Sequence, residues 1–306
     1  MKLKNVVEVA QFDRAMIEEI FDLADKMREL PRGSAPLAGS ILATIFYEPS
    51  TRTRLSFESA MLRLGGQVIS TENAREFSSA IKGESVEDTM RIVSGYADAI
   101  VIRHYEQGAA ARAAKVATVP VINGGDGPGE HPTQALLDLY TIQHELGRID
   151  GLKIALVGDL RYGRAVRSLA LLLCLTTGTE VVFVSPPAVP MGQDVRDALT
   201  AAGVKFHDEE DLAAVVPDVD VVYQTRIQRE RFATPAEYEA SRGIYIVNRD
   251  IINGMKPNAI LMHPLPRVDE ITADVDTDPR VAIFRQAHNG VYLRMALLAL
   301  LLKGNE

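Results

Sequence analysis

The sequence predicts an α/β protein with two open parallel-sheet domains and an active site in the cleft between them. Short apolar runs alternate with helical patterns along all 306 residues, which is typical of parallel sheets whose strands are joined by helices. This length suggests two domains. A hydrophobic share of 47% is enough to fill two cores. Ligands of such sheets bind beyond the carboxyl ends of the strands, and a cleft between two domains is the expected site.

The first predicted domain spans residues 1–148. A helix following Pro49 ends at a Gly-Gly pair, and Ser85 begins the next helix with a capping-box pattern. Pro132 stands where a first-turn proline opens a third helix. A C-terminal helix of about residues 287–306 is expected to return and pack on this domain. The expected strands are 41–46, 67–70, 98–103 and 119–123.

The second predicted domain spans residues 149–286. It begins after the RIDG turn, where the helical pattern stops and a new apolar run starts. Its expected strands are 153–159, 180–186, 204–206, 220–225 and 259–264.

Composition excludes several classes of partner. The formal net charge of −8 argues against nucleic acid or an anionic membrane, and six per cent aromatics without Trp argue against stacked bases. Cys174 is the only cysteine, so no disulfide forms within the chain, which suits the cytoplasm. No stretch is long and apolar enough for a signal peptide or a membrane span. The six histidines lack the spacing of metal ligands, and no cofactor is expected.

Arginines gather directly after the predicted strands. Strand 41–46 is followed by EPSTRTR, strand 98–103 ends in Arg103 before His104, and later strands are followed by LRYGR, RIQRER and PLPR. Because the carboxyl ends of parallel strands share one edge of a sheet, these cations would converge. The pattern favours an anion site.

The stretch Ser50–Arg54, STRTR, lies at a predicted helix start. Backbone N–H groups there attract an anion, and hydroxyl and guanidinium groups suit phosphate. A cation in the first turn is disfavoured by the helix dipole by about 0.3–1 kcal/mol, so two of them indicate a negative ligand. In the alternative, Ser50 only caps the helix and both arginines are solvated. Arg52 is the expected ligand, and the role of Arg54 stays open.

Other glycine-rich stretches carry weaker signals. GGDGPGEHPTQ is not a P-loop, and VGDLRYGR lacks the GxGxxG of dinucleotide-binding folds. A non-enzymatic nucleotide-binding module is therefore only a distant alternative. The loop SSAIKGES, with Ser78 and Lys82, does not follow a strand in the same way as the other polar loops.

Seven motifs in order resemble those of the aspartate/ornithine carbamoyltransferase family, and within it the catalytic chain of aspartate carbamoyltransferase. They cover the chain from about residue 40 to its end. Ornithine carbamoyltransferases are the nearest alternative. They typically have Cys after the His of an HxLP motif, whereas this chain has HPLP at 263–266. The motifs are EPSTRTRLSFESA, IKGES, VIRH, HPTQALLDLYTI, GDLRYGR, TRIQRERF and MHPLPRVDEI.

The resemblance implies a role for each matching residue around carbamoyl phosphate. Its phosphate would be bound by Ser50, Thr51, Arg52 and Thr53, and its carbonyl oxygen by Thr53, Arg103 and His131. Arg52, Thr53, Arg103 and His131 would be the catalytic residues. Gln134 and the backbone of Pro264 and Leu265 would hold the carbamoyl amide next to aspartate.

The resemblance also implies how aspartate is held. Arg164 would bind the α-carboxylate, and Arg226 with Gln228 the β-carboxylate. Ser78 and Lys82 would reach the site of a neighbouring chain, because the family forms homotrimers with shared active sites. Glu48 and Arg231 would hold the domains closed together with Arg164, and Tyr238 lies in the loop that moves.

The implied reaction transfers the carbamoyl group of carbamoyl phosphate to the amine of L-aspartate, a step of de novo pyrimidine biosynthesis. It releases phosphate and N-carbamoyl-L-aspartate and needs no covalent enzyme intermediate. Two carboxylates on the acceptor call for two cations, which favours aspartate over ornithine. Regulatory chains are possible partners that the sequence leaves undecided.

Overall fold

The computed structural model describes residues 3–74, 83–227, Thr234 and 243–303. The chain divides into two compact units: unit 1 comprises Met1–Leu137 and His288–Glu306, and unit 2 comprises Asp138–Ala287. The divisions fall inside two helices, α6 (Pro132–Leu146) and α12 (Ile283–Lys303), whereas the sequence placed the boundary after residue 148. None of the helices in the described ranges is both long and apolar enough to cross a bilayer.

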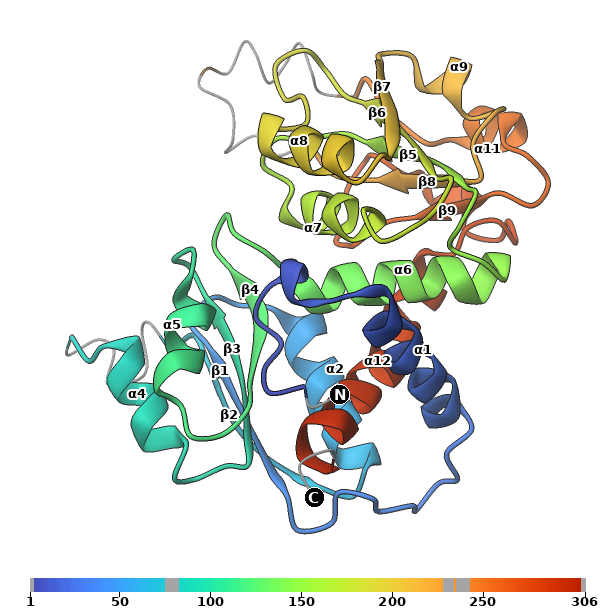
Figure 1. Cartoon of the computed structure of the whole chain (residues 1–306). Coiled ribbons are helices and arrows are strands. Elements are labelled where there is room, and N and C mark those ends of the chain that lie inside the picture. Colours follow the sequence, from blue (N-terminus) through green and yellow to red (C-terminus); the bar gives the residue numbers. More distant parts are fainter. Residues whose placement is uncertain (1–2, 75–82, 228–233, 235–242, 304–306) are drawn as a thin grey trace. The chain divides into compact units, whose positions relative to one another are not determined.

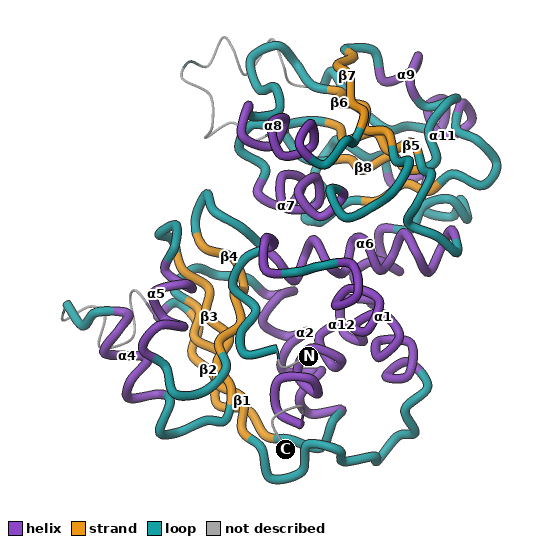
Figure 2. Tube along the Cα trace, viewed as in Figure 1, coloured by secondary structure: helices purple, strands orange, loops and turns teal. Residues whose placement is uncertain are grey.

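Unit 1 contains a parallel four-stranded sheet in the order β2-β1-β3-β4 (Figure 2). From the pair β1 and β3 the sheet grows in opposite directions, so the topological switch point lies between their carboxyl ends. All four predicted strands of this domain are confirmed, and the last continues through Asp126. The strands are β1 (Ile41–Phe46), β2 (Gln67–Glu72), β3 (Ala99–His104) and β4 (Val121–Asp126).

Helices cover both faces of this sheet (Figure 1). On one face Ile102 belongs to a buried cluster with Met90 of α4 and Ala113 of α5. The predicted cap of α4 is confirmed, because the Ser85 side chain accepts a 3.1 Å hydrogen bond from the Asp88 N–H. The opposite face is covered by α1, α2 and α12. The bounds are α1 (Arg14–Arg28), α2 (Thr51–Arg63), α4 (Val86–Val93) and α5 (Ala109–Val116), with a short 3₁₀ helix η1 (Val9–Gln11).

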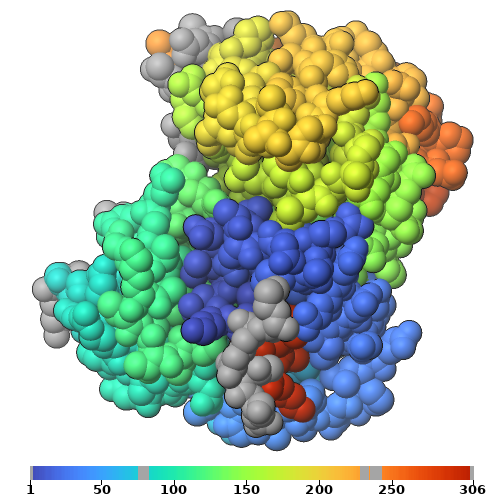
Figure 3. Space-filling view, in the orientation of Figure 1, coloured from blue at the N-terminus to red at the C-terminus, as the bar shows by residue number. Residues whose placement is uncertain are grey.

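The N-terminal segment covers the β4 edge of this sheet. Val6 forms a parallel bridge with Ile122, and the Asn123 side-chain amide donates to the Val7 carbonyl at 3.0 Å. Further along, the Val9 N–H donates to the Glu130 carboxylate at 2.5 Å. Figure 3 shows these first residues, in dark blue, on the surface of unit 1. An otherwise open strand edge is thereby closed.

Helix α12 packs against α1 and α2 in unit 1. Arg28 of α1 donates to the Asn289 side chain at 2.8 Å and lies 4.6 Å from the centre of the Tyr292 ring. The Arg294 guanidinium lies 4.9 Å from the centre of the Phe57 ring of α2. The helix begins one turn before its expected start near residue 287, and its first residue, Ile283, is buried in the core of unit 2.

Unit 2 contains a parallel five-stranded sheet in the order β7-β6-β5-β8-β9, so its switch point lies between β5 and β8 (Figure 2). All five predicted strands are confirmed, with ends shifted by a few residues. They are β5 (Lys153–Val157), β6 (Glu180–Val184), β7 (Lys205–Glu209), β8 (Val221–Gln224) and β9 (Ile260–Met262).

Two layers of helices cover this second sheet as well. One face packs on α9 and α11, where Val215 and Ile252 join Val157 and Leu261 of the sheet in one buried cluster.

Cys174, at the end of α7, is half-buried, and burial raises the pKa of its thiol. The bounds are α7 (Arg164–Leu173), α8 (Gln193–Ala201), α9 (Leu212–Val215), α11 (Arg249–Gly254) and the 3₁₀ helix η4 (Ala273–Val275).

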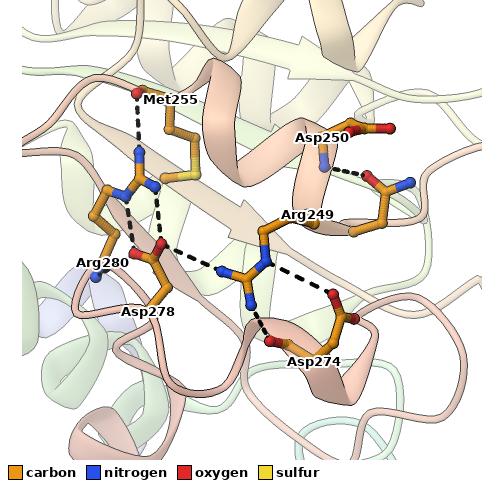
Figure 4. Close-up of polar contacts among 7 residues, drawn as sticks. Arg249, Asp250, Met255, Asp274, Asp278 and Arg280 are labelled. Carbon is orange, nitrogen blue, oxygen red and sulfur yellow. Dashed lines mark hydrogen bonds and ion pairs between the residues drawn. The ribbon is translucent and has the colours of Figure 1, made fainter.

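A cluster of ion pairs ties α11 to the segment that follows η4 (Figure 4). Two nitrogens of Arg280 donate to the Asp278 carboxylate, each at 2.9 Å, and Arg249 lies 3.7 Å from the same carboxylate. Arg280 also donates to the Met255 carbonyl at 3.1 Å, and Arg249 contacts Asp274. The Arg280 hydrogen bonds outweigh the opposing effect of burial and lower the pKa of Asp278 from 3.8 to about 2.

This cluster predicts a pH-dependent contribution to stability. Because the pKa of Asp278 is lower in the folded chain than the ordinary 3.8, its contribution is complete above pH 3.8 and is lost as the pH falls toward about 2. We expect Asp278→Asn to lower the free energy of unfolding at pH 6, and the gap to wild type to narrow below pH 4. Urea unfolding at a series of pH values measures this gap. A gap that stays constant down to pH 2 would contradict the assignment.

Candidate active site

Residues 50–53 begin α2 directly after the switch-point strand β1. Ser50 is the N-cap residue, yet its hydroxyl makes no capping hydrogen bond. The capping hydrogen bond that the alternative assigned to Ser50 is therefore not formed. The N–H groups of a first helical turn have no partner within the helix, so those of Thr51, Arg52 and Thr53 are available to an anion. Thr51 and Arg52 are exposed, whereas Thr53 is buried.

Arg52 has no ion-pair partner among the described residues. Burial of part of its side chain lowers the pKa of the guanidinium, and no charged neighbour in the described ranges offsets this. An arginine keeps its charge at any physiological pH. The side chain therefore presents an uncompensated cation beside the helix N-terminus, which is the arrangement expected of an anion ligand.

Arg54, in contrast, is paired with side chains of the fold. Its guanidinium lies 2.9 Å from the Glu72 carboxylate and 3.7 Å from that of Glu58, and it donates to the Ser70 hydroxyl at 3.1 Å. These contacts tie α2 to the edge strand β2. The question that the sequence left open is thus settled in favour of a structural role for Arg54.

Arg103 is the last but one residue of β3, on the other side of the same switch point. Its guanidinium donates to the Gly124 carbonyl at 3.0 Å, and its Nε lies 3.7 Å from the Glu48 carboxylate. The side chain is only 12% exposed. These contacts orient the guanidinium. Glu48, expected to hold the domains closed, has its ion pair within unit 1, and its closing role stays a prediction.

His131 and Thr53 come together although 78 residues separate them. Nε2 of the buried imidazole lies 3.5 Å from the Thr53 hydroxyl oxygen. The His131 carbonyl accepts the first backbone hydrogen bonds of α6, from Gln134 at 2.9 Å and Ala135 at 3.1 Å. His131 is thus held at a helix start, and the half-buried Gln134 follows one turn later. Unit 1 therefore collects the expected ligands of the phosphate and carbonyl oxygens at one edge of its sheet.

The loop before His131 is shaped by glycine and aspartate. Gly127 has φ +54°, and a Cβ there would lie 2.2 Å from the Tyr105 carbonyl oxygen. Asp126 accepts hydrogen bonds from the backbone N–H groups of Gly108, at 2.7 Å, and Glu130, at 2.9 Å. These contacts turn the chain from β4 into α6.

In unit 2 the ends of β5 and β8 approach each other closely. Gly158 has φ +110°, and a Cβ there would lie 2.4 Å from the Thr225 carbonyl oxygen. The Thr225 hydroxyl donates to the Val157 carbonyl at 2.7 Å. Only glycine fits this approach, so the loops after both strands leave the sheet edge together.

Two of the expected carboxylate ligands lie on these loops. The buried Asp159 accepts from the Tyr162 N–H at 2.9 Å and turns the chain into α7, whose first residue is Arg164. Arg226 is the second residue after β8 and is half-buried. The two arginines therefore leave the same switch point, as two clamps for one dicarboxylate would.

The HPLP turn follows β9 and has an unusual backbone. Leu265 has φ +55°, in the left-handed region that residues with a side chain seldom occupy. Its N–H donates to His263 Nδ1 at 2.8 Å. Pro264 has no N–H. Within the described ranges, no group donates to the carbonyl oxygens of Pro264 and Leu265, so the turn offers hydrogen-bond acceptors.

Five predicted residues lie outside the described part of the chain, and their roles stay predictions. They are Ser78, Lys82, Gln228, Arg231 and Tyr238.

The sequence argument missed the residues that support the HPLP turn. Asp138, Gln286 and His263 are buried and hydrogen-bonded in series. The only signal was that Asp138 and His263 lie inside the motifs HPTQALLDLYTI and MHPLPRVDEI.

Two parallel α/β units, each with arginines at the switch point of its sheet, define a class of two-domain enzymes that act on anionic substrates. The chain belongs to the aspartate/ornithine carbamoyltransferase family. The carbamoyl-P binding domain of that family matches residues 4–144, and its Asp/Orn binding domain matches residues 150–301.

Similar proteins of known identity lie on the aspartate branch of the family. The chloroplastic aspartate carbamoyltransferase of Arabidopsis thaliana is 60% identical over 307 residues, covering 99% of this chain and 79% of the relative. The catalytic subunit from Methanocaldococcus jannaschii is 51% identical and covered to 99% on both sides. A crystal form of the M. jannaschii catalytic subunit superposes with a TM-score of 0.93 at 50% identity, covering 99% of each chain.

A further relative has been solved with a substrate. The aspartate transcarbamoylase of Trypanosoma cruzi in complex with carbamoyl phosphate superposes with a TM-score of 0.92 at 41% identity, covering 98% of this chain and 96% of that one.

The contrast between Arg52 and Arg54 predicts opposite outcomes for two matched substitutions. We expect Arg52→Met to weaken the binding of inorganic phosphate by about tenfold or more, because a charge-assisted hydrogen bond is lost. Arg54→Met should change this affinity by less than about twofold but lower the free energy of unfolding by up to about 1 kcal/mol. Calorimetric titration and thermal unfolding measure the two effects. Equal losses of phosphate affinity in the two variants would contradict the distinction between a ligand role for Arg52 and a structural role for Arg54.

Proposed function

We propose that this chain transfers the carbamoyl group of carbamoyl phosphate to the amine of L-aspartate, yielding N-carbamoyl-L-aspartate and phosphate in de novo pyrimidine biosynthesis. The observation that carries the proposal is Arg52, a cation without an ion-pair partner among the described residues, in the first turn of α2. The T. cruzi relative has been solved with carbamoyl phosphate and aspartate, and with carbamoyl aspartate and phosphate. Both findings support the same reaction.

Carbamoyl phosphate would bind first to the groups at the switch point of unit 1. Its phosphate meets the guanidinium of Arg52, the hydroxyls of Ser50, Thr51 and Thr53, and the N–H groups of the first turn. Its carbonyl oxygen meets Thr53, Arg103 and His131, of which Thr53 and His131 lie 3.5 Å apart. Its amide would donate to the carbonyl oxygens of the HPLP turn, with Gln134 nearby.

Aspartate would be held by the arginines of unit 2. Arg164 at the start of α7 binds the α-carboxylate, and Arg226 with Gln228 binds the β-carboxylate. The amine then attacks the carbamoyl carbon, and the carbonyl oxygen becomes an oxyanion that faces Arg103 and His131. When the tetrahedral intermediate collapses, the bond to the phosphate oxygen breaks and the leaving phosphate takes up the charge and a proton. No covalent bond to the enzyme forms.

Catalysis in this scheme comes from orientation and from charge stabilisation. Arg103 is suited to the second task, because Gly124 and Glu48 already hold its guanidinium in place. Removal of a single oxyanion donor from an enzyme typically lowers the rate by about 10²–10³. Three donors therefore supply much of an ordinary enzymatic acceleration.

Ornithine is the alternative acceptor, and it is not favoured. Its side-chain amine would need acidic partners where this chain has Arg164 and Arg226, and HPLP lacks the cysteine typical of that branch. We expect carbamoylation of L-aspartate and less than about 1% of that rate with L-ornithine, because a mismatched charge removes several kcal/mol of binding. Parallel assays with both amino acids measure this. Transfer to ornithine alone would overturn the proposal.

We further propose a homotrimer whose active sites are shared between chains. Leu55 and Leu62, one heptad apart on α2, are 49% and 60% exposed, and Ile69 on the edge strand β2 is 41% exposed. Such an apolar surface supports contact with another chain. Ser78 and Lys82 would be the residues contributed across that contact. Attachment of regulatory chains and a cytoplasmic location stay predictions, and the plant relatives are named as chloroplastic.

Shared sites predict complementation between two inactive variants. We expect Arg52→Ala and Lys82→Ala each to abolish most activity, and activity to return in part when the two are mixed and reassembled. Hybrid trimers would contain some sites with neither defect. Recovered turnover is measured after native electrophoresis has identified hybrids. Inactive mixtures that contain proven hybrids would place Lys82 in its own chain's site or outside any site.

A further inference from the structure

A series of buried hydrogen bonds leads from α6 through α12 to the HPLP turn, all within unit 2. The Gln286 amide nitrogen donates to one oxygen of Asp138 at 2.6 Å, and the His263 backbone N–H donates to the Gln286 amide oxygen at 2.9 Å. The Leu265 N–H then donates to His263 Nδ1 at 2.8 Å. Asp138 and Gln286 are 0% and 1% exposed.

The direction of these hydrogen bonds is determined by chemistry. A backbone N–H can only donate, so Gln286 must turn its oxygen toward His263 and its nitrogen toward Asp138. The second oxygen of Asp138 accepts from the Tyr223 hydroxyl at 2.6 Å. Burial and the neighbouring Asp138 raise the pKa of Tyr223 well above its ordinary value, so this hydroxyl keeps its proton. Asp138 therefore holds Gln286 in a single orientation.

The series continues through the imidazole of His263. Because Nδ1 accepts from Leu265, the proton of the neutral ring lies on Nε2, which is 2.8 Å from the Glu270 carboxylate. Burial alone would raise the pKa of Glu270, but the hydrogen bond from His263 and bonds from the backbone lower it. The Leu265 N–H thus holds the imidazole at Nδ1, Nε2 lies beside the Glu270 carboxylate, and Leu265 remains at φ +55°.

The outcome at the turn is a pair of carbonyl oxygens without donors. The Leu265 N–H donates its hydrogen bond to His263, and Pro264 has no N–H to donate. In the described part of the chain, no group donates to either carbonyl oxygen. Two such acceptors favour a ligand with an NH₂ group and disfavour a methyl group of the same size, because buried acceptors would lose water without a replacement.

We propose that Gln286, held by Asp138, is a positioning residue that fixes the Pro264 and Leu265 carbonyl oxygens and thereby selects the amide of the carbamoyl donor. The inference rests on the proposed function, since it takes the amide of carbamoyl phosphate as the group that meets the turn. Gln286 itself does not contact the substrate. It acts through the backbone of His263.

Two stable probes isolate recognition of the amide. Phosphonoacetamide carries the phosphonate and the NH₂ group, and 2-oxopropylphosphonate replaces that NH₂ by a methyl group. Their affinity ratio, measured by calorimetric titration, reports how strongly the protein prefers the amide. The affinity for inorganic phosphate, which has no amide, reports on the phosphate ligands at residues 50–53 alone. Wild type should prefer phosphonoacetamide by about tenfold, the value of one to two hydrogen bonds.

Gln286→Met removes both hydrogen bonds at similar side-chain length. We expect the preference for phosphonoacetamide to fall to about twofold or less, with phosphate affinity unchanged. Arg285→Met is the matched control, because Arg285 is the adjacent residue of α12 and binds Glu145 of α6 at 2.8 Å without contacting His263. The Arg285→Met variant should keep the wild-type preference for phosphonoacetamide over 2-oxopropylphosphonate. If Gln286→Met does not fold, Gln286→Asn, too short to reach Asp138 and His263 together, replaces it with the same expectation.

An unchanged preference in a folded Gln286 variant would overturn the inference, and so would a parallel loss of phosphate affinity. The inference would also be overturned if Arg285→Met lost as much of the preference for phosphonoacetamide as Gln286→Met, because equal losses would indicate a general effect on α12. The proposed function is tested separately by the wild type. Wild-type transfer to aspartate combined with an unchanged preference in the variant would refute the role of Gln286 alone.

Discussion

The first turn of a helix is an unfavourable place for a cation, and this constraint applies to an expected ligand in each of the two units. Arg52 and Arg164 each lie in the first turn of the helix that follows a switch-point strand, where the helix dipole repels positive charge. The fold tolerates these positions because the sheets and their covering helices supply the stability. At Arg52 an oxyanion would turn this repulsion into attraction, since no ion-pair partner from the described residues offsets the charge.

The surrounding structure distinguishes the unpaired Arg52 from arginines that are held in ion pairs within the fold. Arg54, two residues after Arg52, is neutralised by Glu72 and Glu58 and ties α2 to the sheet. Arg280 and Arg249 are used around Asp278 in a cluster that stabilises unit 2. Such pairing removes these arginines from competition for an anion, which suits a chain whose net charge is −8.

The sequence predicted the strands of both sheets and the arginines that follow them, because apolar runs and strand-end arginines are local signals. It named Arg52 as the phosphate ligand but left the role of Arg54 open, because the partner Glu72 comes from a strand 18 residues further on. The resemblance assigned Glu48 to domain closure, and that role stays a prediction. Its ion pair with Arg103 could not be predicted, because the pairing of β1 with β3 brings the two residues together. Gln286 was missed because the last helix was expected to begin one residue after it.

The last helix also affects how the chain completes its fold during synthesis. Unit 2 is one continuous stretch, Asp138–Ala287, whereas unit 1 needs residues 288 onward to cover α1 and α2. Leu293, Leu297 and Leu301 of this helix are fully buried. Because domains fold as units while the ribosome moves toward the C-terminus, unit 2 can form first even though unit 1 begins first. A chain that stops short of residue 288 would leave an apolar face uncovered and become a substrate for chaperones and proteases.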